Sequence, residues 1–494
     1  MHYKDDSLLY VPGMIRRMNT KMKKILFILG GIAAALVLAA LIFILTFNIN
    51  SYRPRIEAAA SDAIGMKVRM NGKMKLTRFP RTRVSLEDIL IQNRDTDVAS
   101  IKKAEIEISL MPLLWQKIHI QQVKLITPVF FIIKDRSGRF NIETPEKRLA
   151  WNALLPGFIK AGKYGIEKGR LLYIDERSGV KSEAIGCDLA INNHLAGKGT
   201  FPVTLSLDGD LSCGEVKADE LRISDIRIVI KARQGKFEAD PITMKIFGGD
   251  GKGIIKGVMT GESPEYSVDF AVTKLRFEEV LGQFKVNQST RGELDLKSHL
   301  TMKGRNSDEM TRTLQGNFSL RGNNLSHKGL DLDRVLDKFE NSQNFNIVDV
   351  GAFFVAGPLG TLLTKGYNFG SVFVVSLGGE STILKLVSDW KIKDGIAEAE
   401  DVALSTRENR VAMKGRFDFV NEQFDNMTVA VVDEKGCVRF SQKIHGPFLH
   451  PRIGQTGALK SIVGAIINLY VKTKKFLQDG KCEIFYAGSV PHPK

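Results

Sequence analysis

Residue types that could perform catalysis are present, but their spacing does not assemble a known site. The sequence contains no H-E-x-x-H, C-x-x-C or G-x-S-x-G motif. The glycine-rich run FGGDGKGIIKG at 247–257 does not fit the G-x-x-x-x-G-K-[ST] phosphate loop, so we expect a hairpin turn there. Glu278 and Glu279 are adjacent, and adjacent residues on a strand point to opposite faces. The sequence therefore predicts no catalytic residues and no enzymatic activity.

Histidine and cysteine, the usual metal ligands, are also dispersed. No two of the eight histidines have a metal-ligand spacing with carboxylate or thiolate neighbours, so we expect neither a metal nor a cofactor. The four cysteines, Cys187, Cys213, Cys437 and Cys482, allow three disulfide pairings. The local pairs 187–213 and 437–482 are the simplest of these, and free buried thiols are equally compatible with the sequence.

A single segment, residues 25–47 (ILFILGGIAAALVLAALIFILTF), is suited to cross a membrane. It has 23 residues without a charge. A helix of that length spans about 35 Å, enough for a hydrocarbon core of about 30 Å. The run is too long for the apolar region of a cleaved signal peptide. Lysine and arginine are concentrated before it, so we expect a cytoplasmic tail at 1–24 and a body across the membrane.

The composition is that of a folded, β-rich protein. Hydrophobic residues make up 43% and charged residues 26% of the 494 residues, which excludes a wholly disordered chain. The 45 glycines, against 15 prolines, favour many strands joined by tight turns. The net charge of +16 is dispersed and no nucleic-acid-binding motif appears, so we exclude nucleic acid. Anionic lipid headgroups are a better candidate partner, and an ordinary soluble surface is the simpler explanation of the charge.

Short apolar runs at 84–90, 106–110, 118–126 and 129–133 predict strands, and longer stretches show a clear period of two. Residues 292–304 (GELDLKSHLTMKG) alternate apolar with polar side chains, as in a strand with one face towards water. The apolar positions that share a face in this stretch and in three similar ones are Val203, Leu205, Leu207, Tyr266, Val268, Phe270, Val272, Leu294, Leu296, Leu300, Met302, Val411, Met413, Phe417 and Phe419. Alternation does not distinguish a closed β core from an open apolar groove, and by itself it favours the core.

Helical periodicity is confined to a few places. Residues 56–64 form a short helical pattern that ends at Gly65, and 330–344 predict a second short helix. Residues 350–364 are apolar but too few to span a membrane. Residues 456–477 predict an amphipathic helix, which packs on its own domain, contacts a membrane surface or closes a groove.

Four stretches after the apolar segment carry a recognisable pattern. They are IEAAASDAIGMKVRMNGKMKL (56–76), RFPRTRVSLEDILIQN (78–93), VASIKKAEIEISLMPLLWQKIHIQQVKLITPVFFI (98–132) and DRSGRFNIE (135–143). They resemble the AsmA family of Gram-negative bacteria. Residues 389–426 and 444–453 resemble the end region of that family, whereas 145–330 match it only in style.

The resemblance implies a fold and a location. AsmA-like proteins are held in the bacterial inner membrane by one N-terminal helix, and their periplasmic part is thought to be an elongated, twisted antiparallel β-sheet curled into an apolar groove. The fold would then be mainly β with a few short helices, and the fifteen apolar positions would line a lipid groove. We expect a tail at 1–24, a transmembrane helix at 25–47, an AsmA-like β region at 52–143, a middle β-groove at 144–330 and an AsmA-like C-terminal region at 331–494.

The resemblance also implies a function. The chain would be a lipid-transfer protein that carries phospholipid between the inner and outer membranes, like bridge-like lipid-transfer proteins. The alternative is a structural or assembly factor for outer-membrane proteins, because exposed sheet edges can pair with client strands. Expected partners are phospholipid, the inner membrane, and the outer membrane or a partner protein at the far end. About 30 strands at ~4.8 Å would give ~140 Å, a length for which we expect a partner, an oligomer or a shuttle.

Overall fold

The computed structural model describes residues 49–77, 82–109, 120–143, 162–193, 206–218, 221–283, 290–328, 331–341, 379–448, 452–453 and 482–493. The predicted membrane segment at 25–47 and the predicted helix at 456–477 lie outside these residues, as do Val203 and Leu205. Among the helices in the described ranges, none is long and apolar enough to cross a membrane.

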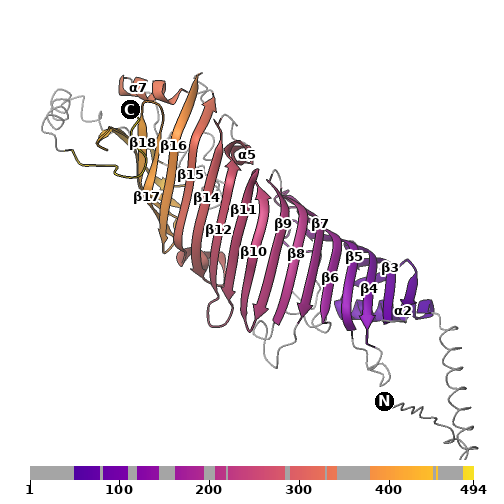
Figure 1. Cartoon of the computed structure of the whole chain (residues 1–494). Helices are drawn as coiled ribbons and strands as arrows, with labels where there is room; N and C mark the ends of the chain where they lie inside the picture. The colour runs from indigo at the N-terminus through magenta and orange to yellow at the C-terminus, as the bar shows by residue number, and fades with distance from the viewer. Residues whose placement is uncertain are drawn as a thin grey trace, which may run out of the picture.

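The described chain is mainly β, with one long twisted sheet of 21 strands and a few short helices (Figure 1). The first strands are β1 (Lys67–Met70), β2 (Met74–Thr77), β3 (Thr82–Asn93), β4 (Thr96–Ile108), β5 (Ile120–Lys134), β6 (Lys163–Asp175) and β7 (Lys181–Asn193). The middle strands are β8 (Ser206–Ala218), β9 (Leu221–Arg233), β10 (Lys236–Ile246), β11 (Gly249–Val258), β12 (Glu265–Arg276), β13 (Thr290–Arg291) and β14 (Glu293–Lys303). The last strands are β15 (Gln315–Lys328), β16 (Glu380–Lys393), β17 (Ile396–Ser405), β18 (Arg410–Asp418), β19 (Gln423–Val432), β20 (Val438–Pro447) and β21 (Arg452–Ile453).

The helices in the described ranges are all short. They are η1 (Ile49–Tyr52), α2 (Arg53–Ile64), α5 (Phe277–Gln283), α6 (Ser307–Arg312) and α7 (Leu332–Asn341). The helices predicted at 56–64 and 330–344 are therefore confirmed as α2 and α7. Gly65 ends α2 with a left-handed φ of 75°, and its N–H donates to the carbonyl of Ser61, which is the usual glycine cap.

Nearly every strand pairs with its sequence neighbour as an antiparallel hairpin, but β5 and β6 are parallel. The expected wholly antiparallel sheet is thus wrong at this one described pair. The chain leaves β5 at one edge of the strands and must return to the opposite edge before β6 begins. A parallel pair requires such a long connection, and residues 135–162 supply it.

Strand β5 also merges two predicted strands, 118–126 and 129–133. Thr127 adopts a left-handed φ of 49°, and the strand continues past Pro128. Left-handed residues recur on neighbouring strands, at Asp88, Lys168, Gly186 and Asp225. The pairing registers on either side place all five at the same level of the sheet. They form a row of irregularities, like β-bulges, that crosses several strands.

The row shifts the side-chain alternation by one residue in each strand. Leu86 and Ile89 are three apart, yet both are buried in the same cluster on β3. Val272 and Leu275 on β12 repeat this spacing, with a register shift between them. The shift keeps apolar side chains on one face along the whole strand, where strict alternation would move them to the other face.

The two faces of the sheet differ in chemistry. The face that carries Leu125, Ile228 and Leu296 is called the inner face, and the opposite face is called the outer face. Ion pairs join adjacent strands on the outer face, namely Lys124–Glu167, Arg170–Glu183, Arg227–Asp210, Lys256–Glu238, Lys303–Glu265, Arg321–Asp389 and Arg416–Asp425. Exposed pairs of this kind contribute little stability each, and their charges make the outer face a hydrated surface.

Candidate functional site

Apolar side chains on the inner face are connected across strands by the pairing register. Val272 pairs with Leu296, Val268 with Leu300 and Tyr266 with Met302. Farther along, Leu404 pairs with Val411, and Val411 with Val431. The twelve predicted lining residues that lie in described strands all share this face: Leu207, Tyr266, Val268, Phe270, Val272, Leu294, Leu296, Leu300, Met302, Val411, Met413 and Phe417. Phe419 follows β18 and packs against the same cluster.

Burial divides these residues into two groups. Val272, Leu294, Leu296, Val411, Met413 and Phe417 belong to a large buried cluster; Leu294 is 1% exposed and Val411 0%. Leu207, Tyr266, Val268, Phe270, Leu300 and Met302 are only half-buried. The shared face is therefore observed, whereas their role as the lining of a lipid groove stays a prediction.

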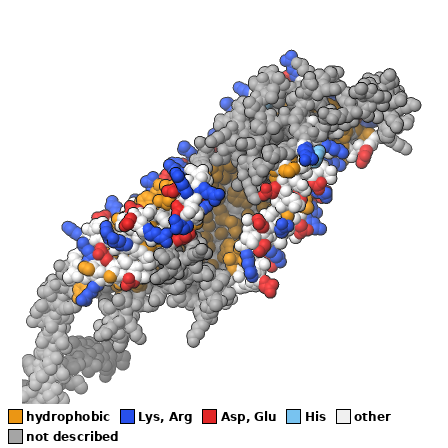
Figure 2. All heavy atoms as spheres, turned by 180° about the vertical axis from the view of Figure 1, so that it is seen from behind, with side chains coloured by type: hydrophobic (Ala, Val, Ile, Leu, Met, Phe, Trp, Pro, Cys, Tyr) orange, Lys and Arg blue, Asp and Glu red, His pale blue; other side chains and the backbone are white. Residues whose placement is uncertain are grey.

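The inner face of β6–β11, called the open segment, holds apolar residues that the sequence analysis did not single out. Its half-buried side chains include Ile166, Leu189, Ile191, Leu211, Ile226, Ile228, Ile230, Phe237, Met244 and Ile255. Figure 2 shows an apolar hollow in the middle of the molecule, bordered by charged side chains. Alternation at 226–230 could have revealed β9, but Asp225 interrupts the pattern before it.

Strand β11 carries glycines at several inner-face positions of the open segment. Among them, Gly251 pairs with Met244 and Gly257 with Phe237 on β10, and Gly253 pairs with Phe270 on β12. A Cβ at Gly257 would lie 2.0 Å from Cε1 of Phe237, and one at Gly253 would lie 2.8 Å from Cδ2 of Phe270. The glycines are needed because neighbouring side chains lie across them. The run 247–257, expected to be a turn, is a turn only at Phe247 and Gly248 and is otherwise a strand.

The inner face of β12–β20, called the closed segment, is covered from its own chain. Phe277 and Val280 of α5 and Leu332 and Leu336 of α7 are at most 1% exposed and belong to its cluster. The N-terminus of α7 is fixed by polar contacts, because Asp333 accepts hydrogen bonds from Thr406 and from Asn409. Both helices therefore pack as part of a core.

The opposite end is covered in the same way by α2. Ile56, Ala60 and Ile64 of this helix pack against a cluster on β1–β4 that includes Met70 and Leu86. Leu125 on β5 is the last residue that packs against this cluster. The open segment therefore begins immediately beyond the reach of α2.

The two disulfides join the locally spaced cysteines, which settles the pairing that the sequence left open. Cys187 on β7 bonds to Cys213, directly opposite it on β8. Cys437 bonds to Cys482, which starts the C-terminal strap, residues 482–493. Among the described residues there is no free cysteine.

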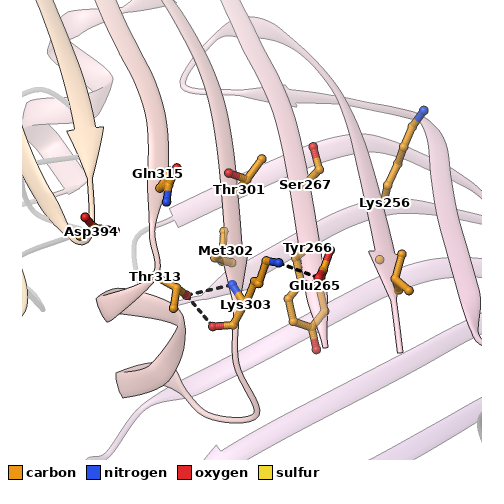
Figure 3. A pocket seen from close by; sticks show the side chains of 12 residues that line it. Lys256, Glu265, Tyr266, Ser267, Thr301, Met302, Lys303, Thr313, Gln315 and Asp394 are labelled. Atoms are coloured by element: carbon orange, nitrogen blue, oxygen red, sulfur yellow. Dashed lines mark hydrogen bonds and ion pairs between the residues drawn. The ribbon is translucent and has the colours of Figure 1, made fainter. Parts of the chain in front are cut away.

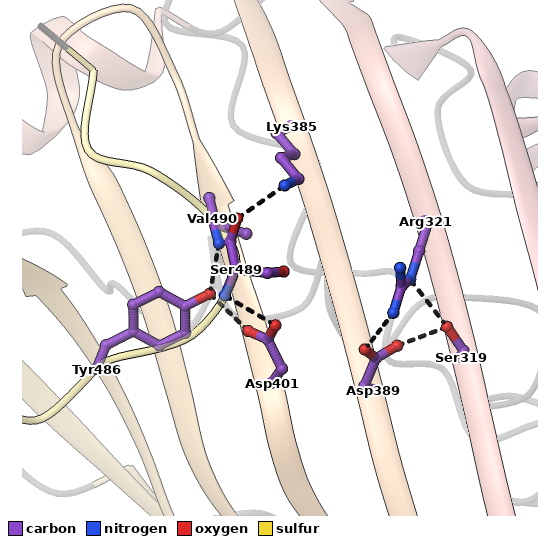
Figure 4. Close-up of polar contacts among 8 residues, drawn as sticks. All are labelled: Ser319, Arg321, Lys385, Asp389, Asp401, Tyr486, Ser489 and Val490. Atoms are coloured by element: carbon purple, nitrogen blue, oxygen red, sulfur yellow. Dashed lines mark hydrogen bonds and ion pairs between the residues drawn. The ribbon is translucent and has the colours of Figure 1, made fainter.

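The C-terminal strap crosses the outer face of β16–β19 (Figure 4). Tyr486 Oη donates to Asp401 Oδ1 at 2.5 Å and accepts from the N–H of Val490 at 3.0 Å. Arg410, 6% exposed, donates to the carbonyl of Val490 and stacks on the ring of Tyr486. Under the strap lie small residues such as Ala412.

Two ionisable groups in this contact are shifted. Burial by itself raises the pKa of Asp401, but hydrogen bonds from Ser489 and Tyr486 outweigh it and hold the pKa below its ordinary value. Burial, together with the hydrogen bond to Asp401, raises the pKa of Tyr486. The neutral phenol and the charged carboxylate are thus the forms that hold the strap.

A shallow pocket of about 370 Å³ lies near the ends of β11–β15 and is lined by residues of both faces of the sheet (Figure 3). Register places Lys256, Ser267, Thr301 and Gln315 in one row across it. Both lysines of the pocket have carboxylate partners, since Lys256 pairs with Glu238 and Lys303 pairs with Glu265. The pocket therefore has no cation left to hold an anion, and we assign it no function.

The described histidines and carboxylates form no recognisable reactive group. No set of three or more metal-ligating side chains comes together in the described ranges. Glu278 and Glu279 lie on α5 and not on a strand, and Arg276 pairs with Glu279. His327 is buried against Thr290 Oγ1 at 2.7 Å, and burial lowers its pKa. The expectation that the chain is not an enzyme stays a prediction.

Comparison with known proteins identifies the family. The model of the AsmA family matches residues 22–193 and, a second time, residues 193–357. The matches include the segment 145–330, where the sequence showed only a general likeness, and stop before the resemblance noted at 389–426. No curated protein gives a significant match. Because the family model covers more than half of the chain, this protein belongs to the AsmA family.

Proposed function

We propose that the protein is a lipid-transfer protein that holds the acyl chains of phospholipid on the inner face of its sheet. Family membership and a large β-sheet with one apolar face fit either a lipid-transfer or an assembly role. The observation that favours lipid is the open segment. Most of its apolar side chains remain only half-buried along six successive strands, whereas most of those of the closed segment belong to a buried cluster, with half-buried residues beside it, mainly on β12 and β14.

Half-exposed apolar side chains carry an energetic cost that a ligand can relieve. Burying apolar surface yields about 25 cal/mol per Å², so an acyl chain along the open segment would be favourably bound. Six strands at ~4.8 Å spacing give a face about 25 Å long, which suits the length of an acyl chain. The headgroup would remain in water among the charges at the border of the hollow (Figure 2).

The same proposal places the body in the periplasm and the N-terminus in the cytoplasm. The family match begins at residue 22, just before the apolar segment 25–47. Two disulfides in the described chain support an oxidising compartment, because cytosolic thiols are kept reduced. On this basis the segment 25–47 anchors the protein in the bacterial inner membrane.

The length of the sheet favours a partner at the far end. β1 and β2 both pair with β3, and β13 and β14 both pair with β15, so the 21 strands fill 19 positions. At ~4.8 Å per step this gives about 90 Å, shorter than the ~140 Å expected from the sequence. We therefore propose that delivery to the outer membrane requires a partner protein, an oligomer or a shuttle mode.

Assembly of outer-membrane proteins is the alternative. It would use a sheet edge to pair with client strands. At the N-terminal edge, side chains of the chain itself already take the backbone donors of Val68 and Met70. That edge therefore offers less to a client than the sequence suggested.

The test is lipid capture at matched positions. A photo-crosslinking residue at position 228 faces inwards, and one at position 229 faces outwards on the same strand. The full-length protein is extracted in detergent after illumination and examined by mass spectrometry. We expect phospholipid on position 228 and none on position 229. Bound outer-membrane precursor without lipid at 228 would favour the alternative.

A further inference from the structure

The N-terminal end of the sheet is closed by contacts that engage both its apolar face and its edge. α2 places Ile56, Ala60 and Ile64 on the cluster of β1–β4. In this cluster Met70, Met74 and Leu86 are at most 4% exposed. The apolar surface of the first strands is thus already occupied before any ligand arrives.

The edge of the sheet is engaged by hydrogen bonds from the same region. Ser61 Oγ accepts from the N–H of Val68 at 2.9 Å, and Glu57 Oε1 accepts from the N–H of Met70. These two donors point away from β3, because the alternate residue Asn71 donates to β3 at Asp88. α2 is therefore bound along the edge as well as over the face.

Two further contacts extend this engagement to β2. Asn50 Oδ1 accepts from the N–H of Met74 at 3.1 Å, and Arg53 Nη2 donates to the carbonyl of Gly72 at 2.6 Å. Gly72 has no room for a side chain, since a Cβ there would lie 2.6 Å from the Cβ of Glu87. The turn between β1 and β2 therefore sits tightly between α2 and β3.

We infer that α2 is a fixed end plug, and that lipid enters or leaves the inner face over its long side, between β6 and β11. This inference rests on the proposed lipid-transfer function. α2 follows closely after the predicted membrane segment, so the end of the sheet nearest the membrane is the end that is closed. An acyl chain that comes from the membrane must pass beside α2 and first meets half-buried apolar side chains of the inner face on β5 and β6, near Ile166.

The test compares lipid capture on the part of the inner face that α2 covers with capture on the part beyond α2. Photo-crosslinking residues are placed at position 84, which packs against the α2 cluster, and at position 166, on the inner face of β6. The full-length, membrane-anchored protein is illuminated in cells, and bound lipid is measured after purification. We expect capture at 166 and only background at 84. Equal capture at the two positions would overturn the plug.

A second variant asks whether α2 is the cause. Glu57→Ala combined with Ser61→Ala removes the two hydrogen bonds to β1 and loosens the helix, while its apolar face remains. Lipid capture at position 84 should then appear, and capture at 166 should be unchanged. A cooperative thermal unfolding transition of the body would show that the variant is still folded. No gain at 84 in a folded double variant would refute the inference. Absence of lipid at 166 in the unaltered chain would refute the proposed function itself.

Discussion

The open segment and the closed segment share the same alternation of apolar and polar residues, but only the closed segment is covered to form a core. On the closed segment the inner face is covered by α5 and α7, and across β16–β19 the outer face is covered by the C-terminal strap. On the open segment the inner face is half-exposed and the outer face carries ion pairs. A sheet can thus change from a covered to a partly exposed apolar face along its length without a change in the strand pattern.

The difference predicts where substitutions change stability and where they change ligand binding. Residues of the closed segment, such as Leu320 and Val429, are 0% exposed and hold the sheet in shape. Residues of the open segment leave apolar surface available to a ligand. We expect substitutions in the first region to act on folding and substitutions in the second to act on lipid binding.

The largest effect is expected from a charge in the closed segment. Leu296→Arg places an unpaired cation at a site that is 4% exposed, and burial of an unpaired charge costs more than about 4 kcal/mol. Chemical denaturation of the purified body should show this loss, or the variant should be degraded in cells. Thr301→Arg, on the exposed outer face of the same strand, is the control. A fully stable Leu296→Arg would mean that this face is open as well.

The next effect concerns the strap. Tyr486→Phe removes the hydrogen bond to Asp401 and leaves the N–H of Val490 without its acceptor. A loss of about 1–2 kcal/mol in the free energy of unfolding is expected. Hydrogen exchange of residues 482–493 should also increase. Unchanged exchange there would show that the hydroxyl of Tyr486 does not hold the strap.

A charge in the open segment should cost little stability and still abolish binding. In Ile228→Arg the guanidinium can extend to water while its methylene groups stay on the sheet, so we expect a loss below about 1 kcal/mol. Co-purified phospholipid should fall sharply compared with the unaltered protein. Val229→Arg, one residue away on the outer face, should keep its lipid. Loss of lipid in both variants would argue against a role for one face.

The smallest effect is a pH dependence of the strap. The pKa of Asp401 is lowered in the folded chain, so its contribution is present above its ordinary value near 4 and is lost as the pH falls through the lowered value. Stability measured from pH 6 to pH 3 should therefore fall slightly less in Asp401→Asn than in the unaltered protein. Identical acid profiles would show that Asp401 does not couple to folding.

The sequence predicted the β architecture and the sharing of one apolar face because period-two alternation reports the environment of each strand directly. It also indicated α2 and α7, and it allowed the two local cysteine pairs as one option beside free buried thiols. It did not reveal the parallel pair of β5 and β6, because no pattern in residues 135–162 indicates that the chain crosses to the opposite end of the strands before β6 begins. Nor did it separate Leu296 from Ile228, since an alternating apolar residue looks the same whether something covers it or not.

The row of left-handed residues at Asp88, Thr127, Lys168, Gly186 and Asp225 has a consequence for how this chain can vary. Each marks the point where one extra residue shifts the alternation of its strand. Loss of the left-handed conformation at one of them, such as Asp225, with the residue retained would turn the half-strand before it over and place Ser224 on the inner face in place of Ile223. A one-residue insertion or deletion elsewhere within these strands would also turn a half-strand over, whereas the turns between strands can lengthen without disturbing the apolar face.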